Sequence, residues 1–87
     1  MINTKNKIEA LYKELVEIAR RLDQYYDIDK IKPYSVCVWT KGKNGENVFD
    51  ILANEIVFYS EDHAIIEGAK PIVEKIQSKL KEIEQCL

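Results

Sequence analysis

The chain has 87 residues, which is the length of one small domain with a thin core. Apolar and aromatic residues make up 46% of the chain and charged residues 32%, a composition that excludes a disordered protein. The net charge is −2 with the two signs interspersed, so neither a basic nucleic-acid-binding arm nor an acidic mimic of nucleic acid is indicated.

The expected location follows from the apolar runs and the cysteines. No run reaches the roughly 18 apolar residues of a membrane span, and the first residues lack the apolar core of a signal peptide. Cys37 and Cys86 form no CxxC pair, and a secreted scaffold of this size would usually carry more cysteines. We therefore expect a soluble, cytoplasmic protein with free thiols. Because thin cores are often stabilised by oligomerisation, homodimerisation is an open alternative.

A first helix is predicted from Thr4 to Tyr26. Thr4 is a suitable N-cap because its hydroxyl can accept a free backbone N–H of the first turn. Apolar residues then recur at spacings of three and four, and charged residues occupy the opposite face. The apolar stripe consists of Ile8, Leu11, Leu15, Ile18, Leu22 and Tyr25.

The middle of the chain is predicted to form strands. Residues 27–33 are expected to be a linker, since Pro33 cannot continue a helix. The dipeptide Asn44-Gly45 is a strong hairpin signal, because both residues tolerate positive φ. The expected strands are Tyr34–Lys41, Glu46–Leu52 and Glu55–Tyr59.

A second helix is predicted from Ser60, as its N-cap, to Leu87. Gly68 and Pro71 lie inside its apolar stripe. We expect one helix that is kinked there; the alternative is a short helix that ends at Gly68, followed by a second helix with Pro71 in its first turn. The predicted fold class is α+β, with a helix, a short antiparallel sheet of two to three strands built on the Asn-Gly hairpin, and a helix, in two layers. The domain is expected to span residues 1–87.

The hairpin register predicts which side chains share a face. If Asn44-Gly45 is a two-residue turn, the facing pairs are Lys43–Glu46, Lys41–Val48, Trp39–Asp50 and Cys37–Leu52. Because side chains alternate between faces, the inner face should then carry Val36, Val38, Thr40, Phe49, Ile51 and Ala53. A loop of three or five residues would scramble these faces.

The outer face of the predicted hairpin is unusually apolar. It would carry Cys37, Trp39, Lys41, Val48, Asp50 and Leu52. A tryptophan on the outside of a two-layer domain needs a cover, which would be a dimer mate, a target protein or a folded-back half of the second helix. Trp is a favoured interface anchor, so we expect partner binding through Trp39, Lys41, Lys43, Val48, Asp50 and Leu52.

No catalytic, metal or cofactor motif is indicated. His63 is the only histidine, and general acid–base catalysis or metal binding would need partners that its neighbours Glu61 and Asp62 do not provide from one helical turn. A pair of Cys37 as nucleophile and His63 as base is not favoured, since a strand cysteine is usually a small buried apolar residue. We expect a protein that is not an enzyme and needs no cofactor.

Two functional hypotheses remain beside an enzyme or small-ligand binder. The favoured one is a small protein-interaction module, in the manner of the inhibitors that phage and mobile-element accessory genes often encode, which binds a larger protein through the outer sheet face. The alternative is a nucleic-acid-binding domain that uses the basic hairpin tip with Lys41 and Lys43. Its helix–three strands–helix order is shared with double-stranded-RNA-binding domains, but Glu61 and Asp62 stand where phosphate would approach the last helix.

Overall fold

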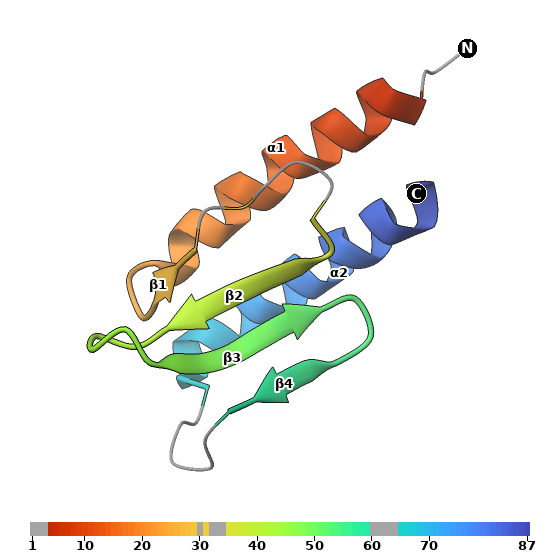
Figure 1. Ribbon diagram of the computed structural model, residues 1–87. Helices are drawn as coiled ribbons and strands as arrows, with labels where there is room; N and C mark the ends of the chain where they lie inside the picture. The colour runs from red at the N-terminus through yellow and green to blue at the C-terminus, as the bar shows by residue number, and fades with distance from the viewer. Residues whose placement is uncertain (1–3, 30, 32–34, 60–64) are drawn as a thin grey trace.

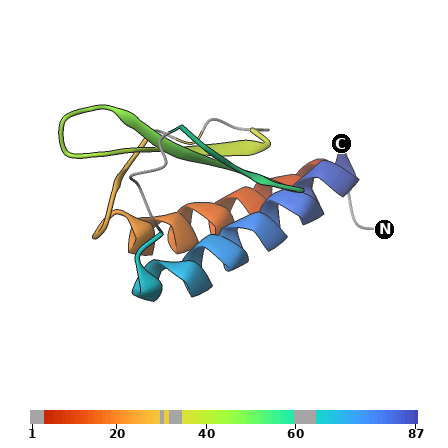
Figure 2. The same cartoon turned by 90° about the horizontal axis from the view of Figure 1, so that it is seen from below.

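The computed structural model describes residues 4–29, 31, 35–59 and 65–87. These form a four-stranded antiparallel sheet in the order β1-β2-β3-β4, with both α-helices on one of its faces (Figures 1 and 2). The elements are α1 (Thr4–Leu22), β1 (Asp27–Ile28), β2 (Cys37–Lys41), β3 (Asn47–Leu52), β4 (Ile56–Phe58), the 3₁₀ turn η1 (Glu67–Ala69) and α2 (Lys70–Cys86). The α+β class in two layers is confirmed, but the sheet has four strands instead of two or three.

The extra strand, β1, lies in the segment that was predicted to be a linker. Asp27 pairs with Lys41 and Ile28 with Thr40 at the edge of β2. For this pairing α1 must end early, at Leu22 and not at Tyr26. The ring of Tyr26 packs edge-on against Phe49 with centroids 5.2 Å apart, and this contact directs the chain from the helix to the sheet. Tertiary packing therefore overrides the local helical pattern.

The β2–β3 hairpin has a three-residue loop, where a two-residue turn was predicted. The N–H of Gly42 donates to the carbonyl of Glu46 (2.9 Å), and the N–H of Gly45 donates to the carbonyl of Gly42 (3.0 Å), which leaves Lys43, Asn44 and Gly45 as the loop. Gly45 has a φ of +79°, the left-handed conformation that closes such a loop. The predicted pairs Lys43–Glu46 and Lys41–Val48 are consequently wrong, and Lys41 stands opposite Asn47.

A β-bulge in β3 restores the predicted register beyond the loop. Between the pairs Lys41–Asn47 and Thr40–Phe49, Val48 is the extra residue of β3. From there on, Trp39 faces Asp50 and Cys37 faces Leu52, as predicted. The bulge turns Val48 inward, so that it is 0% exposed and does not lie on the outer face.

The hydroxyl of Thr40 stabilises the sheet beside the bulge. Thr40 is fully buried, and its Oγ1 donates to the carbonyl of Phe49 (2.6 Å) and accepts from the N–H of Phe49 (3.1 Å). A buried hydroxyl without partners would be destabilising, whereas here both of its bonds are made to the residue that follows the bulge.

The second helix is not continuous through Gly68 and Pro71. Ile65 and Ile66 are not helical, η1 covers Glu67–Ala69, and α2 begins at Lys70 with Pro71 in its first turn. The kinked helix was therefore the wrong choice, because the Pro71 ring would clash with the carbonyl of Glu67 in a continuous helix. Its predicted N-cap, Ser60, lies outside the described residues.

The core lies between the helix layer and the inner face of the sheet. The helices run antiparallel and share an ion pair between Lys79 of α2 and Glu14 of α1 (2.7 Å). The hydroxyl of Tyr12 donates to the carbonyl of Ser35, which ties α1 to the chain before β2. The largest fully buried side chains are Leu15, Leu22, Val38, Val48, Phe49, Ile51, Val73, Ile76, Leu80 and Ile83. Of the predicted inner face, only Val36 is exposed, since it precedes β2.

We expect the loop to depend on the backbone conformation of Gly45. Replacement by Ala should lower the free energy of unfolding by about 1 kcal/mol, because a Cβ disfavours positive φ. No atom lies within 4 Å of that added Cβ, so steric overlap contributes nothing. Gly45→Asn is the matched control and should cost less, since Asn tolerates this conformation. Urea denaturation measures both, and equal losses would contradict this account.

We also expect Thr40→Val to lower the free energy of unfolding by about 1–3 kcal/mol. Valine has nearly the same shape, but it leaves the backbone groups of Phe49 without the hydroxyl at the bulge. Urea denaturation of the variant checks this expectation. An unchanged midpoint would show that the hydroxyl does not stabilise the bulge.

Candidate protein-interaction surface

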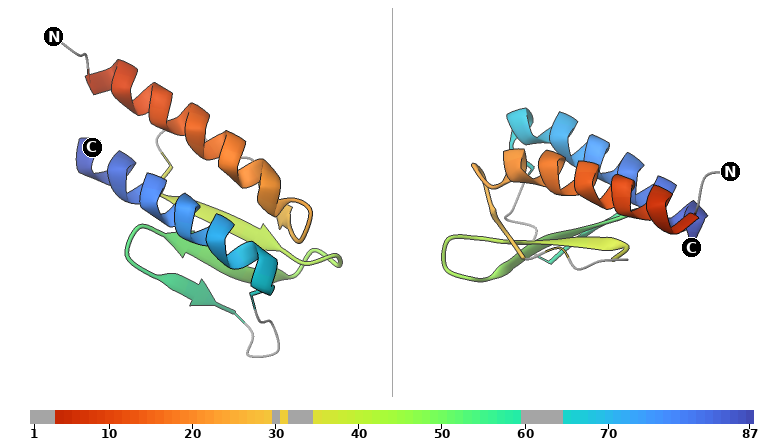
Figure 3. Two further views of the ribbon diagram at one scale, coloured as in Figure 1. Left: turned by 180° about the vertical axis from the view of Figure 1, so that it is seen from behind. Right: turned by 90° about the horizontal axis from the view of Figure 1, so that it is seen from above.

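The sheet face opposite the helices is the candidate site. No described element covers this face (Figures 2 and 3). The strand registers and the alternation of side chains define its members, which we call the outer face. The outer face consists of Asp27, Asp29, Cys37, Trp39, Lys41, Asp50, Leu52, Glu55, Val57 and Tyr59.

Trp39 lies near the middle of the outer face, in the second strand of the sheet. It is 54% exposed although it belongs to a strand with neighbours on both sides. Leu52 and Val57 lie on the two following strands and are partly buried. Tyr59, directly after β4, is also 54% exposed. The face therefore combines aromatic and aliphatic surface in one layer.

The charged groups next to Trp39 on the outer face each have a partner within the chain. Nζ of Lys41 lies 3.5 Å from Oδ1 of Asp29, with both side chains partly exposed. The hydroxyl of Tyr59 donates a short hydrogen bond to Oδ2 of Asp50. The pKa of Tyr59 is raised, first by this hydrogen bond to a carboxylate and then by desolvation. These pairs leave Trp39 between a cation–anion pair on one side and a tyrosine–carboxylate pair on the other.

The structure gathers most, but not all, of the residues predicted for partner binding. Trp39, Lys41, Asp50 and Leu52 lie together on the outer face. Lys43 lies apart from them, exposed in the hairpin loop. Val48 is buried in the core because of the bulge, so its assignment to the outer face is wrong.

Several outer-face residues on or next to the edge strands were not among those predicted for partner binding. Val57 and Tyr59 belong to the third predicted strand, and alternation within Glu55–Tyr59 would have placed them on one face. Alternation alone could not predict how this strand is aligned with the hairpin. Asp29 was missed because nothing in a polar linker predicts a two-residue strand.

The thiol of Cys37 on the outer face is partly buried. Partial burial and, secondarily, the Asp50 carboxylate raise the pKa of the Cys37 thiol, against a lowering contribution from a hydrogen bond with Trp39. The thiolate is the reactive form, so a raised pKa disfavours attack at neutral pH. Among the described residues, no group of His, Cys, Asp and Glu side chains could hold a metal ion. His63 lies outside the described residues.

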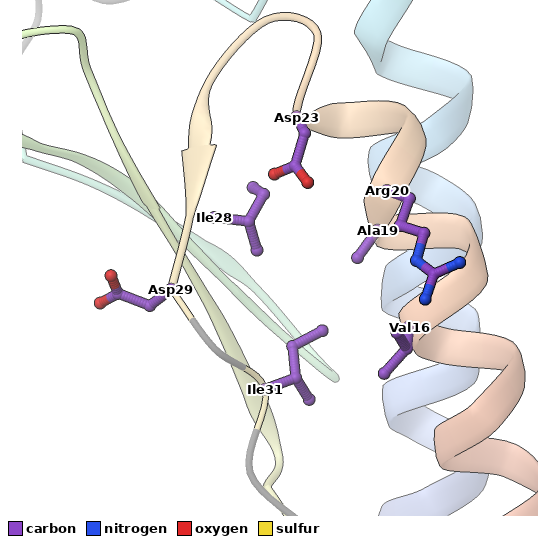
Figure 4. Close-up of a pocket in the computed structure, with 7 residues that line it drawn as sticks. All are labelled: Val16, Ala19, Arg20, Asp23, Ile28, Asp29 and Ile31. Carbon is purple, nitrogen blue, oxygen red and sulfur yellow. The ribbon is translucent and has the colours of Figure 1, made fainter.

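A shallow groove of about 390 Å³ separates α1 from the β1 edge (Figure 4). Val16 and Ala19 line it from the helix, and Ile28 and Ile31 point toward them. Small-ligand sites usually add a few convergent polar groups to such an apolar lining. Here Arg20 pairs with Glu17 (3.2 Å), and Asp29 points away from the isoleucines. Asp23, directly after α1, is the third charged residue of the lining (Figure 4).

Comparisons with family models, curated proteins and solved structures found no match to this chain. In the described part of the chain, neither helix has the length and hydropathy that a membrane crossing requires.

We expect the tyrosine–carboxylate pair to make stability depend on pH in the alkaline range. The pKa of Tyr59 is higher in the folded state than its ordinary value of 10.0, so the contribution of this residue is complete below that pH and is lost as the pH rises through the folded-state pKa. The difference in unfolding free energy between the wild type and Tyr59→Phe should therefore shrink above pH 10.0.

Urea denaturation at a series of pH values measures this difference. Asp50→Asn removes the charge of the acceptor and is the control. In the Asp50→Asn background, the change in unfolding free energy caused by Tyr59→Phe should vary less with pH. A wild-type difference that stays constant through the alkaline range would contradict the pairing.

Proposed function

We propose that this chain is a non-enzymatic protein-interaction module that binds a larger protein through its outer face. The observation that carries the proposal is the exposure of Trp39, at 54%, near the middle of a sheet face that no described element covers. Tryptophan is enriched among the residues that dominate binding energy, because it offers a large rigid surface.

The surroundings of Trp39 have the composition of a binding surface. Leu52 lies diagonally across from Trp39 on β3, and Val57 lies one strand further, opposite Asp50. Asp50 stands opposite Trp39, and Lys41 follows Trp39 by two residues on the same face of β2. Interfaces commonly have an apolar centre and a polar rim. The charged groups of Lys41, Asp29 and Asp50 are already paired within the chain, so a partner can cover Trp39 without leaving these charges unpaired.

The proposal extends to how the module would act. A binding face without an activated nucleophile acts by occupying a surface of its partner, and inhibition is the simplest consequence. A role as an inhibitor encoded by a phage or mobile-element accessory gene, acting in the cytoplasm, belongs to this proposal, and it is supported by the small size and the Lys- and Ile-rich composition of the chain.

The alternative is nucleic-acid binding through the hairpin tip. The tip extends beyond the ends of the helices and carries Lys43, which is exposed (Figures 1 and 3). Lys41, however, is paired with Asp29. The side chain of Glu46 accepts a hydrogen bond from the N–H of Asn44 (3.1 Å), which places a carboxylate in the loop itself. A phosphate backbone would meet mixed charge there, so we favour the outer face.

Replacement of Trp39 by Ala tests the proposal. We expect the variant to bind a captured partner at least about thirtyfold more weakly, since a central interface tryptophan contributes about 2 kcal/mol or more. Its thermal unfolding should stay cooperative, because the indole is half exposed in the free chain. Leu87→Ala is the matched control, since Leu87 is an exposed apolar residue at the end of α2.

The measurement is an affinity pull-down from the native host lysate, with and without nuclease, followed by titration of the recovered partner. One stoichiometric protein that resists nuclease, and that is lost with Trp39→Ala but not with Leu87→Ala, is the expected result. Recovered nucleic acid that Lys43→Glu eliminates would support the alternative. A large loss of stability in Trp39→Ala would overturn the interpretation of Trp39 as an interface residue.

A further inference from the structure

The two edges of the sheet differ in how they are protected. β1 is only two residues long, carries Asp27 and is followed by Asp29, and charged residues on short edges discourage pairing with other chains. β4 consists of Ile56, Val57 and Phe58, with no charge, proline or bulge. Neither helix lies over β4, and no described element runs along its open side (Figures 1 and 3).

The hydrogen bonds to β3 show which groups of β4 face the open edge. The N–H of Leu52 donates to the carbonyl of Glu55 (2.9 Å), and the N–H of Tyr59 donates to the carbonyl of Val48 (3.1 Å). In an antiparallel ladder, every second residue points its backbone groups to the same neighbour. Residues 55, 57 and 59 therefore bond to β3, whereas Ile56 and Phe58 direct their N–H and carbonyl groups outward. No described residue pairs with these outward groups.

We propose that β4 pairs antiparallel with β4 of a second copy of this chain, in a register centred on Val57. In this register Ile56 faces Phe58 of the second copy, and each such pair exchanges two N–H···O bonds. The two symmetric pairs thus make four backbone hydrogen bonds and satisfy every outward group of both strands. A register centred on Ile56 would instead pair Phe58 with residue 54, which lies outside β4, so the two strands would overlap only in part.

The side chains are complementary in the same register. Ile56 and Phe58 lie on the inner side, where Phe58 is 48% exposed although its ring contacts Phe49 (5.9 Å between centroids). Pairing would place the Ile56 and Phe58 side chains of both copies in one apolar row. On the outer side Val57 meets its own counterpart, and Glu55 faces Tyr59 of the second copy, so no like charges oppose each other. A second copy is therefore the occupant that this edge fits.

The proposal is independent of the partner-binding role of the outer face. Pairing at the β4 edge would join two sheets side by side and leave Trp39 exposed on each. The contact involves only a short strand from each copy, so we expect a weak dimer whose population rises with concentration.

Amide hydrogen exchange across a concentration series tests the hydrogen bonds directly on the wild type. The amides of Ile56 and Phe58 should become protected as the concentration rises, in step with dimerisation measured by sedimentation equilibrium. The amide of Val57 bonds to β3 in both states and serves as the internal control. A chain that stays monomeric into the millimolar range, or a dimer in which Ile56 and Phe58 gain no protection, would overturn the proposal.

Charge variants of Val57 test the symmetry of the register. In a Val57-centred dimer, Val57→Lys places two like charges face to face and should raise the dissociation constant at least about tenfold, as should Val57→Glu. An equal mixture of the two variants should associate again, since lysine then faces glutamate. Val36→Lys is the matched control, because Val36 is an exposed valine that precedes β2, away from β4, and it should dimerise like the wild type.

Two further outcomes are decisive. Trp39→Ala should leave dimerisation unchanged. If this variant no longer dimerises, the dimer forms through the outer face and the edge pairing is overturned. Because Val57 stands opposite Asp50, Val57→Glu places two carboxylates next to each other within one chain. The unfolding of this variant is therefore checked for cooperativity. If that variant does not fold, Val57→Lys together with the exchange series on the wild type still decides the proposal.

Discussion

The insertion of Val48 between the pairs Lys41–Asn47 and Thr40–Phe49 sets the relation between the two faces of the sheet. The three-residue loop shifts the ladder by one residue, and one residue is enough to send every following side chain to the opposite face. The bulge shifts it back. Phe49 and Ile51 thereby reach the core, and Asp50 and Leu52 reach the outer face. The buried hydroxyl of Thr40, bonded twice to Phe49, stabilises the strand at this point.

The two-layer arrangement leaves surfaces that no described element covers. Both helices are used on the inner face, where their apolar stripes meet the sheet and each other. No described element covers Trp39 on the outer face, and neither helix lies over β4 (Figure 3). A small domain can bury only part of its apolar surface, so the remaining exposed apolar groups are candidates for contacts with other chains.

The outer face and the β4 edge are compatible as binding surfaces. Edge pairing uses backbone groups of Ile56 and Phe58, whereas the outer face would use the side chains of Trp39 and its neighbours. A dimer joined at β4 would present two copies of the outer face on one continuous sheet. Such a bivalent surface binds a partner that has two matching sites far more tightly than one copy does, if the spacing fits. The unprotected edge and the exposed tryptophan would then serve one assembly.

The amino-acid sequence by itself determined the two helical regions, the hairpin and most of their faces. The three-and-four spacing in α1 and α2 identified the helices, because a helix buries one stripe. The Asn-Gly signal identified the hairpin, and alternation assigned Val38, Thr40, Phe49 and Ile51 to the core. These features depend on neighbours in sequence, which is why local patterns identify them.

Only the tertiary structure decided the features that depend on distant contacts. β1 exists because Asp27 and Ile28 find an edge on β2, and α1 ends early because Tyr26 packs on Phe49. The position of Val48 depends on a loop length and a bulge that compensate each other, and neither is visible in the alternation of β3 alone. The place of Val57 and Tyr59 on the outer face, and the open edge of β4, follow from pairing between strands. Pairing of this kind is set by the whole sheet and not by any one segment of the chain.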